Sequence, residues 1–222
     1  MKLDSQRQMS DSFRIAALLA VVGGFLDAYT YVARGGVFAN AQTGNIVLFG
    51  LSIAEKNWIN AISYFVPILA FVSGIFLDEW IRKRFLPGRK IHWRQIIIIF
   101  EIITLCVVAW LPQNNSADMI ANTLVSFVCS MQTQSFRKVH GLPYASTMCT
   151  GNLRSGTELL FQYTQTKDRK QRIKSLHYYG VIGFFILGAG IGALVTKQLS
   201  ASAAIWCNTL LLLVYFLLFR QH

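Results

Sequence analysis

A tripeptide whose side chains can bind a polar ligand occurs twice in this sequence. Residues 39–50 read ANAQTGNIVLFG and residues 146–157 read STMCTGNLRSGT, 107 positions further on. Glycine suits a break in the backbone before a helix, and Thr and Asn oxygens can cap the first N–H groups of that helix. A helix that starts inside a membrane offers free N–H donors and a partial positive charge to a polar or anionic ligand. We therefore expect a substrate-binding site at Thr43, Gly44, Asn45, Thr150, Gly151 and Asn152.

Four ionisable residues lie within apolar segments or beside the second motif, and we treat all four as candidates for coupling or for a pathway. Asp27 follows two glycines in the first apolar segment, and Glu101 stands among Ile and Leu residues. A charge inside a bilayer costs at least about 2–3 kcal/mol, so each needs a partner, a proton or water. Asp27 is the candidate for proton coupling, with a hydrogen-bonded structural role as the alternative. Arg154 and Glu158 are four residues apart and predict an ion pair on a helix, although Arg154 could also hold an anion.

Patterns typical of enzymes and of bound cofactors are missing from the sequence. It contains no H-E-x-x-H, G-x-S-x-G or P-loop pattern. The four histidines are scattered, and the four cysteines show no C-x-x-C spacing. We therefore expect no catalytic residue, no cofactor and no metal, and an intramembrane enzyme would lack a nucleophile–base pair.

The motif residues and the ionisable candidates lie in or beside long apolar segments. The 222 residues are 54% hydrophobic and only 14% charged, whereas soluble domains average about 25% charged residues. Segments of roughly 17–25 apolar residues can cross a bilayer as helices. Six segments qualify: 13–34, 59–81, 94–111, 118–136, 176–196 and 203–219. The fourth is the weakest, because several Asn, Gln and Thr residues dilute it.

The net charge of +11 comes from basic residues that lie between the apolar segments, so it indicates membrane topology and not nucleic-acid binding. Basic residues are dense in loops 82–94 and 167–174, whereas loop 112–118 has none. Placing the dense loops in the cytoplasm predicts six spans in a bacterial inner membrane with both termini cytoplasmic. Three charges at span ends are interpreted as outer-side or surface charges: Arg34, Asp78 and Glu79.

The two motifs also anchor an internal repeat within one domain, residues 1–222. An offset of 114 matches Phe71 with Phe185 and Gly74 with Gly188. Each half, about 13–111 and 118–219, then holds three spans and one motif segment. Three spans per half invert the second half relative to the first, as in many transporters. We predict an all-α membrane protein of six transmembrane helices in two inverted repeats, each with a broken or re-entrant Thr-Gly-Asn half-helix.

The two halves differ just before the motif. The first half has Gly35 and Gly36 there, whereas Pro143 could supply the break in the second half by removing a backbone donor.

The segment that begins at Gly23-Gly24-Phe25-Leu26-Asp27-Ala28 and ends at Gln42-Thr43-Gly44-Asn45 resembles the YoaK-like family of bacterial multi-pass membrane proteins. Ala41-Gln42 before Thr43 departs from the usual M-T-G-N pattern of that family. The resemblance implies a bacterial inner-membrane protein and no particular substrate.

Two functions from different classes remain open. The first is a secondary transporter or permease for a small polar or anionic solute, with the two half-helices at its central site and proton coupling through Asp27. The alternative is a non-transporting membrane protein that binds a partner or lipid through its basic cytoplasmic loops. Partners expected from the sequence are the lipid bilayer, the solute and, through glycine-rich helix faces, a second copy in a homodimer.

Overall fold

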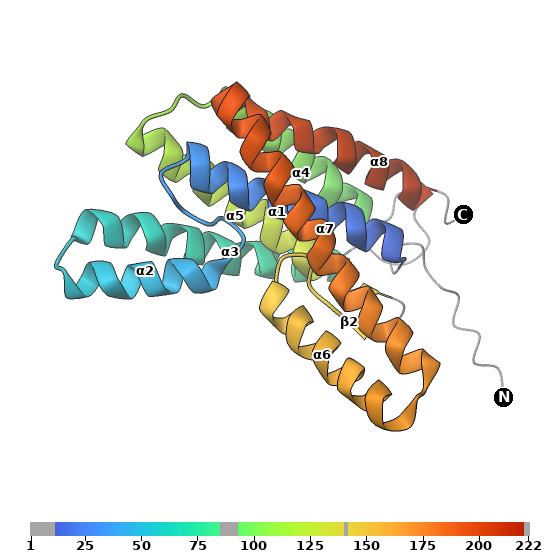
Figure 1. Cartoon of the computed structure of the whole chain (residues 1–222). Helices are drawn as coiled ribbons and strands as arrows, with labels where there is room; N and C mark the ends of the chain where they lie inside the picture. The colour runs from blue at the N-terminus through green and yellow to red at the C-terminus, as the bar shows by residue number, and fades with distance from the viewer. Residues whose placement is uncertain (1–11, 85–92, 140–141, 220–222) are drawn as a thin grey trace.

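The computed structural model describes residues 12–84, 93–139 and 142–219, and nearly all of them are helical (Figure 1). The elements are α1 (Phe13–Ala33), α2 (Gln42–Ala54), α3 (Trp58–Arg84), α4 (Trp93–Trp110), α5 (Asn115–Ser135), β1 (Lys138–Val139), β2 (Leu142–Pro143), α6 (Cys149–Thr166), α7 (Arg169–Leu199), the 3₁₀ helix η2 (Ser200–Trp206) and α8 (Cys207–Phe219). A helix coincides with each of the six predicted apolar segments. Helix α7 begins earlier than predicted, because Asp168 Oδ1 accepts a hydrogen bond from Lys170 N at 2.9 Å and caps it.

Four stretches of the described chain are long and apolar enough to cross a membrane. They are α1, α3, α4 and the run Arg169–Phe219, which takes in α7, η2 and α8. Helix α5 falls outside this set, and its polar residues Asn122 and Gln132 are buried within the bundle. The chain is therefore an all-helical membrane protein, and the bilayer is its environment.

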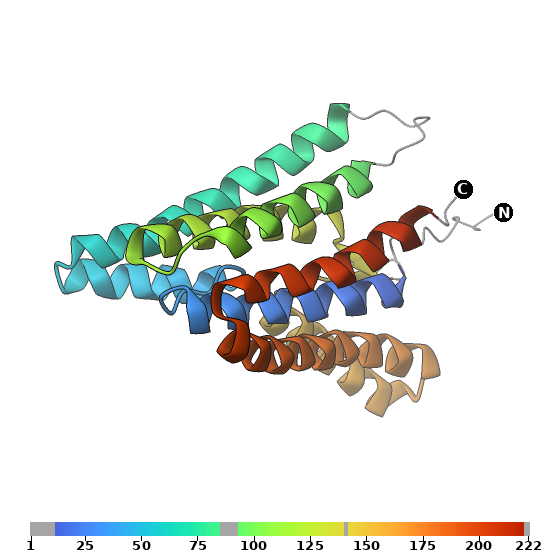
Figure 2. The ribbon, with the colours of Figure 1, turned by 90° about the horizontal axis from the view of Figure 1, so that it is seen from above.

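Helix α1 lies inside the bundle, packed against α7, α8 and α5 (Figure 2). Its contact with α7 is close because glycine removes side chains at the crossing. A Cβ at Gly24 or Gly188 would overlap a backbone carbonyl of the facing helix. Helix α3 meets α5 in the same way, since a Cβ at Gly74 would overlap the Phe127 carbonyl and the Ser130 side chain. Small residues thus set the two closest helix contacts.

Two short helices begin at the motifs and each forms a hairpin with the long helix that follows. Helix α2 begins at Gln42 and packs against α3, and α6 begins at Cys149 and packs against α7. Both start near the middle of the molecule and run toward opposite ends of it (Figures 1 and 2).

The chain approaches the two motifs differently in each half. Gly35 and Gly36 follow α1 with φ angles of 79° and 75°, which L side chains rarely adopt. In the second half, β1 pairs with β2 in antiparallel register, with Lys138 opposite Pro143. Pro143 therefore lies in a short hairpin several residues before α6 and does not itself form the break.

The expectation that Asp78 is a surface charge is wrong. Asp78 is fully buried where α3 faces α5, and Ser135 Oγ donates a hydrogen bond to its Oδ1. Glu79, by contrast, keeps partial exposure and accepts hydrogen bonds from Arg82 Nη1 at 3.2 Å and from Gln134 Nε2 at 2.5 Å. The close approach at Gly74 turns Asp78, four residues later on the same face, toward α5.

Candidate functional site

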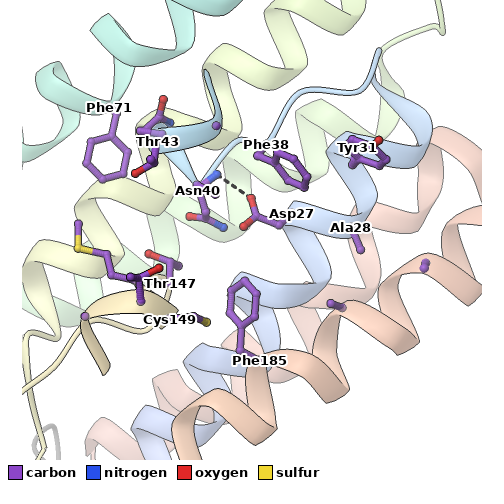
Figure 3. Close-up of a pocket in the computed structure, with 18 of the residues that line it drawn as sticks. Asp27, Ala28, Tyr31, Phe38, Asn40, Thr43, Phe71, Thr147, Cys149 and Phe185 are labelled. Atoms are coloured by element: carbon purple, nitrogen blue, oxygen red, sulfur yellow. Dashed lines mark hydrogen bonds between the residues drawn. The ribbon is translucent and has the colours of Figure 1, made fainter. Parts of the chain in front are cut away.

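A cavity of about 750 Å³ lies where the starts of α2 and α6 meet α1, α3 and α7 (Figure 3). Its volume falls within the range of roughly 300–1,000 Å³ that is usual for small-molecule sites. The lining comprises Asp27, Ala28, Tyr31, Val32, Phe38, Asn40, Ala41, Gln42, Thr43, Gly44, Phe71, Thr147, Met148, Cys149, Thr150, Gly151, Phe185, Ala189 and Ala193. Segments more than 100 residues apart in the chain therefore share one cavity.

The threonine and glycine of both motifs line this cavity. Thr43 and Gly44 contribute from the first turn of α2, and Thr150 and Gly151 contribute from the first turn of α6. Neither helix has a side-chain cap at its N-terminus. The first-turn N–H groups of both helices are therefore not covered by the capping hydrogen bonds that the sequence suggests.

The two motif asparagines have a different position from the one expected. Asn45 and Asn152 are buried behind the cavity and do not belong to its lining. Asn45 Nδ2 donates to Phe38 O at 2.7 Å, and Asn152 Nδ2 donates to Ala145 O at 2.7 Å. Both bonds reach back seven residues, so each asparagine holds the loop that leads into its own helix.

Asp27 fixes the approach to α2 from the side of α1. Its Oδ1 accepts a hydrogen bond from the backbone N–H of Asn40 at 2.8 Å, the dashed line in Figure 3. Asn40 Nδ2 in turn donates to Gly23 O at 3.1 Å. The Asp27 side chain is 5% exposed and lines the cavity, so the structural role and the ligand-facing role expected of it are compatible.

Aromatic rings form much of the cavity wall. Tyr31 and Phe38 stack with their centroids 4.8 Å apart and their planes 17° apart. Phe71 from α3 and Phe185 from α7 contribute two more rings from the far walls (Figure 3). Phe71 and Phe185 are the pair that the internal repeat matches, but nothing in the sequence indicated that they would face a cavity.

The charge of the lining bears on the expected anionic solute. Among the described lining residues there is no Lys, Arg or His, and Asp27 is the one carboxylate. The two helix N-termini favour an anion, but the Asp27 carboxylate already accepts an N–H group at the approach to α2 and repels a second negative charge. By its charge, this lining suits a neutral or cationic ligand better than an anion.

Glu101 lies outside the cavity lining but connects to the second motif loop. It is fully buried, and Gln132 Nε2 donates to its Oε1 at 3.0 Å. Ser146 Oγ donates to Gln132 Oε1 at 3.4 Å, one residue before the cavity residue Thr147. A carboxylate thus supports the loop before the motif in each half. Asp27 bonds the first loop directly, whereas Glu101 acts on the second loop through Gln132.

Arg154 and Glu158 are not brought into the site. Both are exposed on α6 and neither lines the cavity. Within the described chain their side chains form no ion pair, so the predicted i,i+4 pair is not formed. Without a partner that orients it, neither side chain has a defined role here.

Arg34, grouped by its sequence position with the outer-side and surface charges, is a buried structural residue. Its side chain is completely buried at the end of α1, and its guanidinium lies 5.7 Å from the centre of the Tyr29 ring. The guanidinium donates to Tyr29 Oη (2.8 Å), Asp118 Oδ1 (3.0 Å), Val108 O (2.9 Å), Leu111 O (3.1 Å) and Pro112 O (2.7 Å). Arg34 therefore ties α1 to the turn between α4 and α5.

Comparison with known proteins agrees with the membrane architecture. Residues 15–218 match the family described as "Protein of unknown function (DUF1275)". The chain is 25% identical over 146 residues to the UPF0700 transmembrane protein YoaK of Bacillus subtilis (strain 168). That alignment covers 64% of this chain and 64% of the length of YoaK. No solved structure matches the chain.

Proposed function

The chain belongs to the DUF1275 family of YoaK-like membrane proteins, and from that premise we propose that it is a small secondary transporter. The main support for this proposal is that Thr43-Gly44 and Thr150-Gly151 line one cavity together with the buried carboxylate of Asp27. In many transporters the substrate site lies between two repeats, where half-helices begin near the middle of the membrane.

Helix packing supports two equivalent, inverted halves. Suppose that α1 is exchanged with α5, α2 with α6, α3 with α7 and α4 with α8. The pair α1·α7 then becomes α5·α3, and the pair α2·α3 becomes α6·α7. All four pairs are in contact. The exchange also turns α4·α5 into α8·α1, both of which are in contact. The equivalence extends to Gly74 and Gly188 at the close crossings, and to the two motif asparagines with their seven-residue hydrogen bonds.

In the proposed topology six helices cross the bacterial cytoplasmic membrane and both termini are cytoplasmic. Basic residues at the end of α3 and at the start of α7 lie toward the same end of the molecule as the start of α1 and the end of α8 (Figure 2). By the positive-inside rule this end is cytoplasmic. Helix α2 then enters from the outer face and α6 from the cytoplasmic face.

The orientation of the two half-helices predicts opposite labelling of their far ends. In a chain without its four cysteines, Glu55→Cys after α2 and Gln165→Cys in the last turn of α6 both place a thiol at an exposed position. A membrane-impermeant maleimide should label Glu55→Cys only from outside and Gln165→Cys only from inside. Labelling of both from one face would contradict the inverted arrangement.

Asp27 is the proposed coupling group. Its carboxyl lines the cavity and can exchange a proton with it. A proton on Asp27 removes the one carboxylate charge from the described lining, so protonation changes the affinity of the cavity for a charged solute.

Alternating access predicts that the cavity reaches both sides of the membrane in turn. Thr43→Cys and Thr150→Cys place thiols on two sides of the cavity, and both positions are exposed. We expect each to be labelled from either face of sealed vesicles, because the cavity opens to both sides during the cycle. Gly50→Cys, an exposed position of α2 outside the cavity lining, is the control and should label from the outer face alone.

A one-sided result would oppose transport. If Thr43→Cys and Thr150→Cys react from a single face while the proteins are folded, the cavity does not alternate. A non-transporting protein that binds a partner or lipid through its basic loops would then be the better explanation.

A further inference from the structure

We propose that the cavity binds an organic ammonium ion with an apolar body, which exchanges with a proton at Asp27. The inference rests on the proposed transport function and names the class of its solute. It replaces the anionic solute expected from the helix N-termini alone.

The charge that faces the cavity favours a cation. Asp27 is the one carboxylate of the described lining, and no basic side chain there neutralises it. The nearby cation Arg34 is used by Asp118 and by backbone carbonyls. A buried carboxylate needs a positive partner or a proton, and an ammonium ion supplies the first.

The titratable groups near Asp27 give no competing positive charge. They are the Tyr31 hydroxyl on α1, the Cys129 thiol on α5 and the Cys149 thiol at the start of α6. None of these groups is cationic in either protonation state. The linings from α3 and α7 consist of Phe71, Phe185 and alanines, which do not titrate.

An unused hydrogen-bond acceptor lies on Asn40, the residue whose N–H group bonds Asp27. Asn40 lines the cavity and is 4% exposed, and its Oδ1 accepts no hydrogen bond in the described chain. A buried acceptor without a partner costs about 1–3 kcal/mol. Once its side chain turns toward the cavity, Asn40 Oδ1 would accept a hydrogen bond from an ammonium N–H group whose charge pairs with Asp27. The close-up shows the Asn40 side chain between Asp27 and Thr147 (Figure 3).

The cavity walls suit an organic cation with an apolar body. The stacked Tyr31 and Phe38, together with Phe71 and Phe185, present aromatic rings to the same space as the carboxylate. Ring faces attract organic cations and also pack against an apolar body. A bare metal ion would leave most of the 750 Å³ empty, and the described residues include no group of three or more His, Cys, Asp or Glu that could hold one.

The ammonium ion exchanges with a proton because both bind the same carboxylate, Asp27. When the ammonium binds, a protonated Asp27 releases its proton to water, and when the ammonium leaves, the carboxylate can take up a proton. Because the cation requires the ionised carboxylate, its apparent affinity falls as the pH is lowered. Binding below the pKa of Asp27 should weaken about tenfold for each pH unit.

The experiment uses three probes that share one body: 4-phenylbutylammonium, 4-phenylbutanol and 4-phenylbutanoate. Binding to the full chain in lipid nanodiscs is measured by calorimetry, with empty nanodiscs subtracted. We expect the ammonium to bind at least about tenfold more tightly than the alcohol, and the carboxylate to bind most weakly. Asp27→Asn keeps an oxygen for the Asn40 N–H and should abolish the preference for the ammonium. Glu55→Gln, an exposed carboxylate outside the cavity lining, should retain it.

Two results would overturn the inference. One is equal binding of ammonium and alcohol, and the other is a preference that survives Asp27→Asn. Either can occur while Thr43→Cys and Thr150→Cys still label from both faces, in which case transport stands and the solute class is wrong. Should Asp27→Asn not fold, Phe185→Leu serves instead, because loss of a ring should weaken the ammonium several-fold more than the alcohol.

Discussion

Replacement of Arg34 by methionine is expected to destabilise the folded protein by about 3 kcal/mol, among the largest effects of any single substitution in this chain. Methionine fills much of the volume but leaves Asp118 and three backbone carbonyls of residues 108–112 without their donor. Buried acceptors that lose a charged donor are costly because no water replaces it. For a chain of this length the apparent Tm should fall by roughly 6–12 °C.

The measurement is thermal unfolding of the purified protein in one detergent. Arg34→Lys should fall between the wild type and Arg34→Met, because a lysine keeps the charge but cannot reach Tyr29, Asp118 and the carbonyls together. Arg172→Met is the matched control, since Arg172 is exposed on α7, and its effect should stay within about 0.5 kcal/mol. Equal shifts for the two methionine variants would show that Arg34 does not hold the α4–α5 turn.

The structural role of Arg34 could not be predicted from the sequence, because it depends on tertiary packing. A lone arginine at the end of an apolar segment has the same local pattern as a loop charge, and the positive-inside rule counts it as one. Its five acceptors come from residues 29 and 108–118, and they are available only because α1 packs beside the α4–α5 turn. Asp78 was misread for the same reason, since its burial depends on the close approach of α5.

Other features could be predicted because they depend on local pattern. Long apolar segments have few alternatives to helix in a bilayer, so the helix positions follow directly from the sequence. A motif that recurs at the same place in each half predicted a shared site; Thr43 and Thr150 line one cavity, and ligand binding there stays a prediction. The roles of Asn45 and Asn152 could not be predicted, because an amide side chain can bond a ligand, a helix end or a loop carbonyl, and only the path of the loop decides.

The sequence predicted Asp27 as a coupling group beside the half-helices, but it did not predict the contact that holds Asp27 at the approach to α2. Two helix N-termini by themselves favour an anion. Asp27 is 16 residues before Thr43, and the turn at Gly35-Gly36 folds the intervening segment back so that Asn40 meets Asp27. This tertiary contact is the basis on which we propose a cation in place of the anion that the motif suggests.

The second large effect is expected at the glycines of the helix crossings. Gly188→Ala should destabilise the protein by about 1–3 kcal/mol, because its Cβ would overlap the Val21 carbonyl and the backbones of α1 and α7 would have to separate. Gly190→Ala, two residues further along α7, meets no atom within 4 Å. Alanine should therefore stabilise there by up to about 1 kcal/mol through its higher helix propensity. The same thermal-unfolding assay should show shifts of opposite sign for the two variants.

Gly74 extends this test to the other half of the chain. Its Cβ would overlap the Phe127 carbonyl of α5, so Gly74→Ala should cost as much as Gly188→Ala. Equal losses at both glycines would support equivalent crossings, since Gly74 and Gly188 are matched by the repeat. If only one of them matters, the two halves do not share a packing scheme, and the argument for an inverted repeat weakens. If Gly188→Ala and Gly190→Ala behave alike, α1 and α7 are not in backbone contact, and the cavity that Asp27 of α1 shares with Phe185 of α7 must be revised.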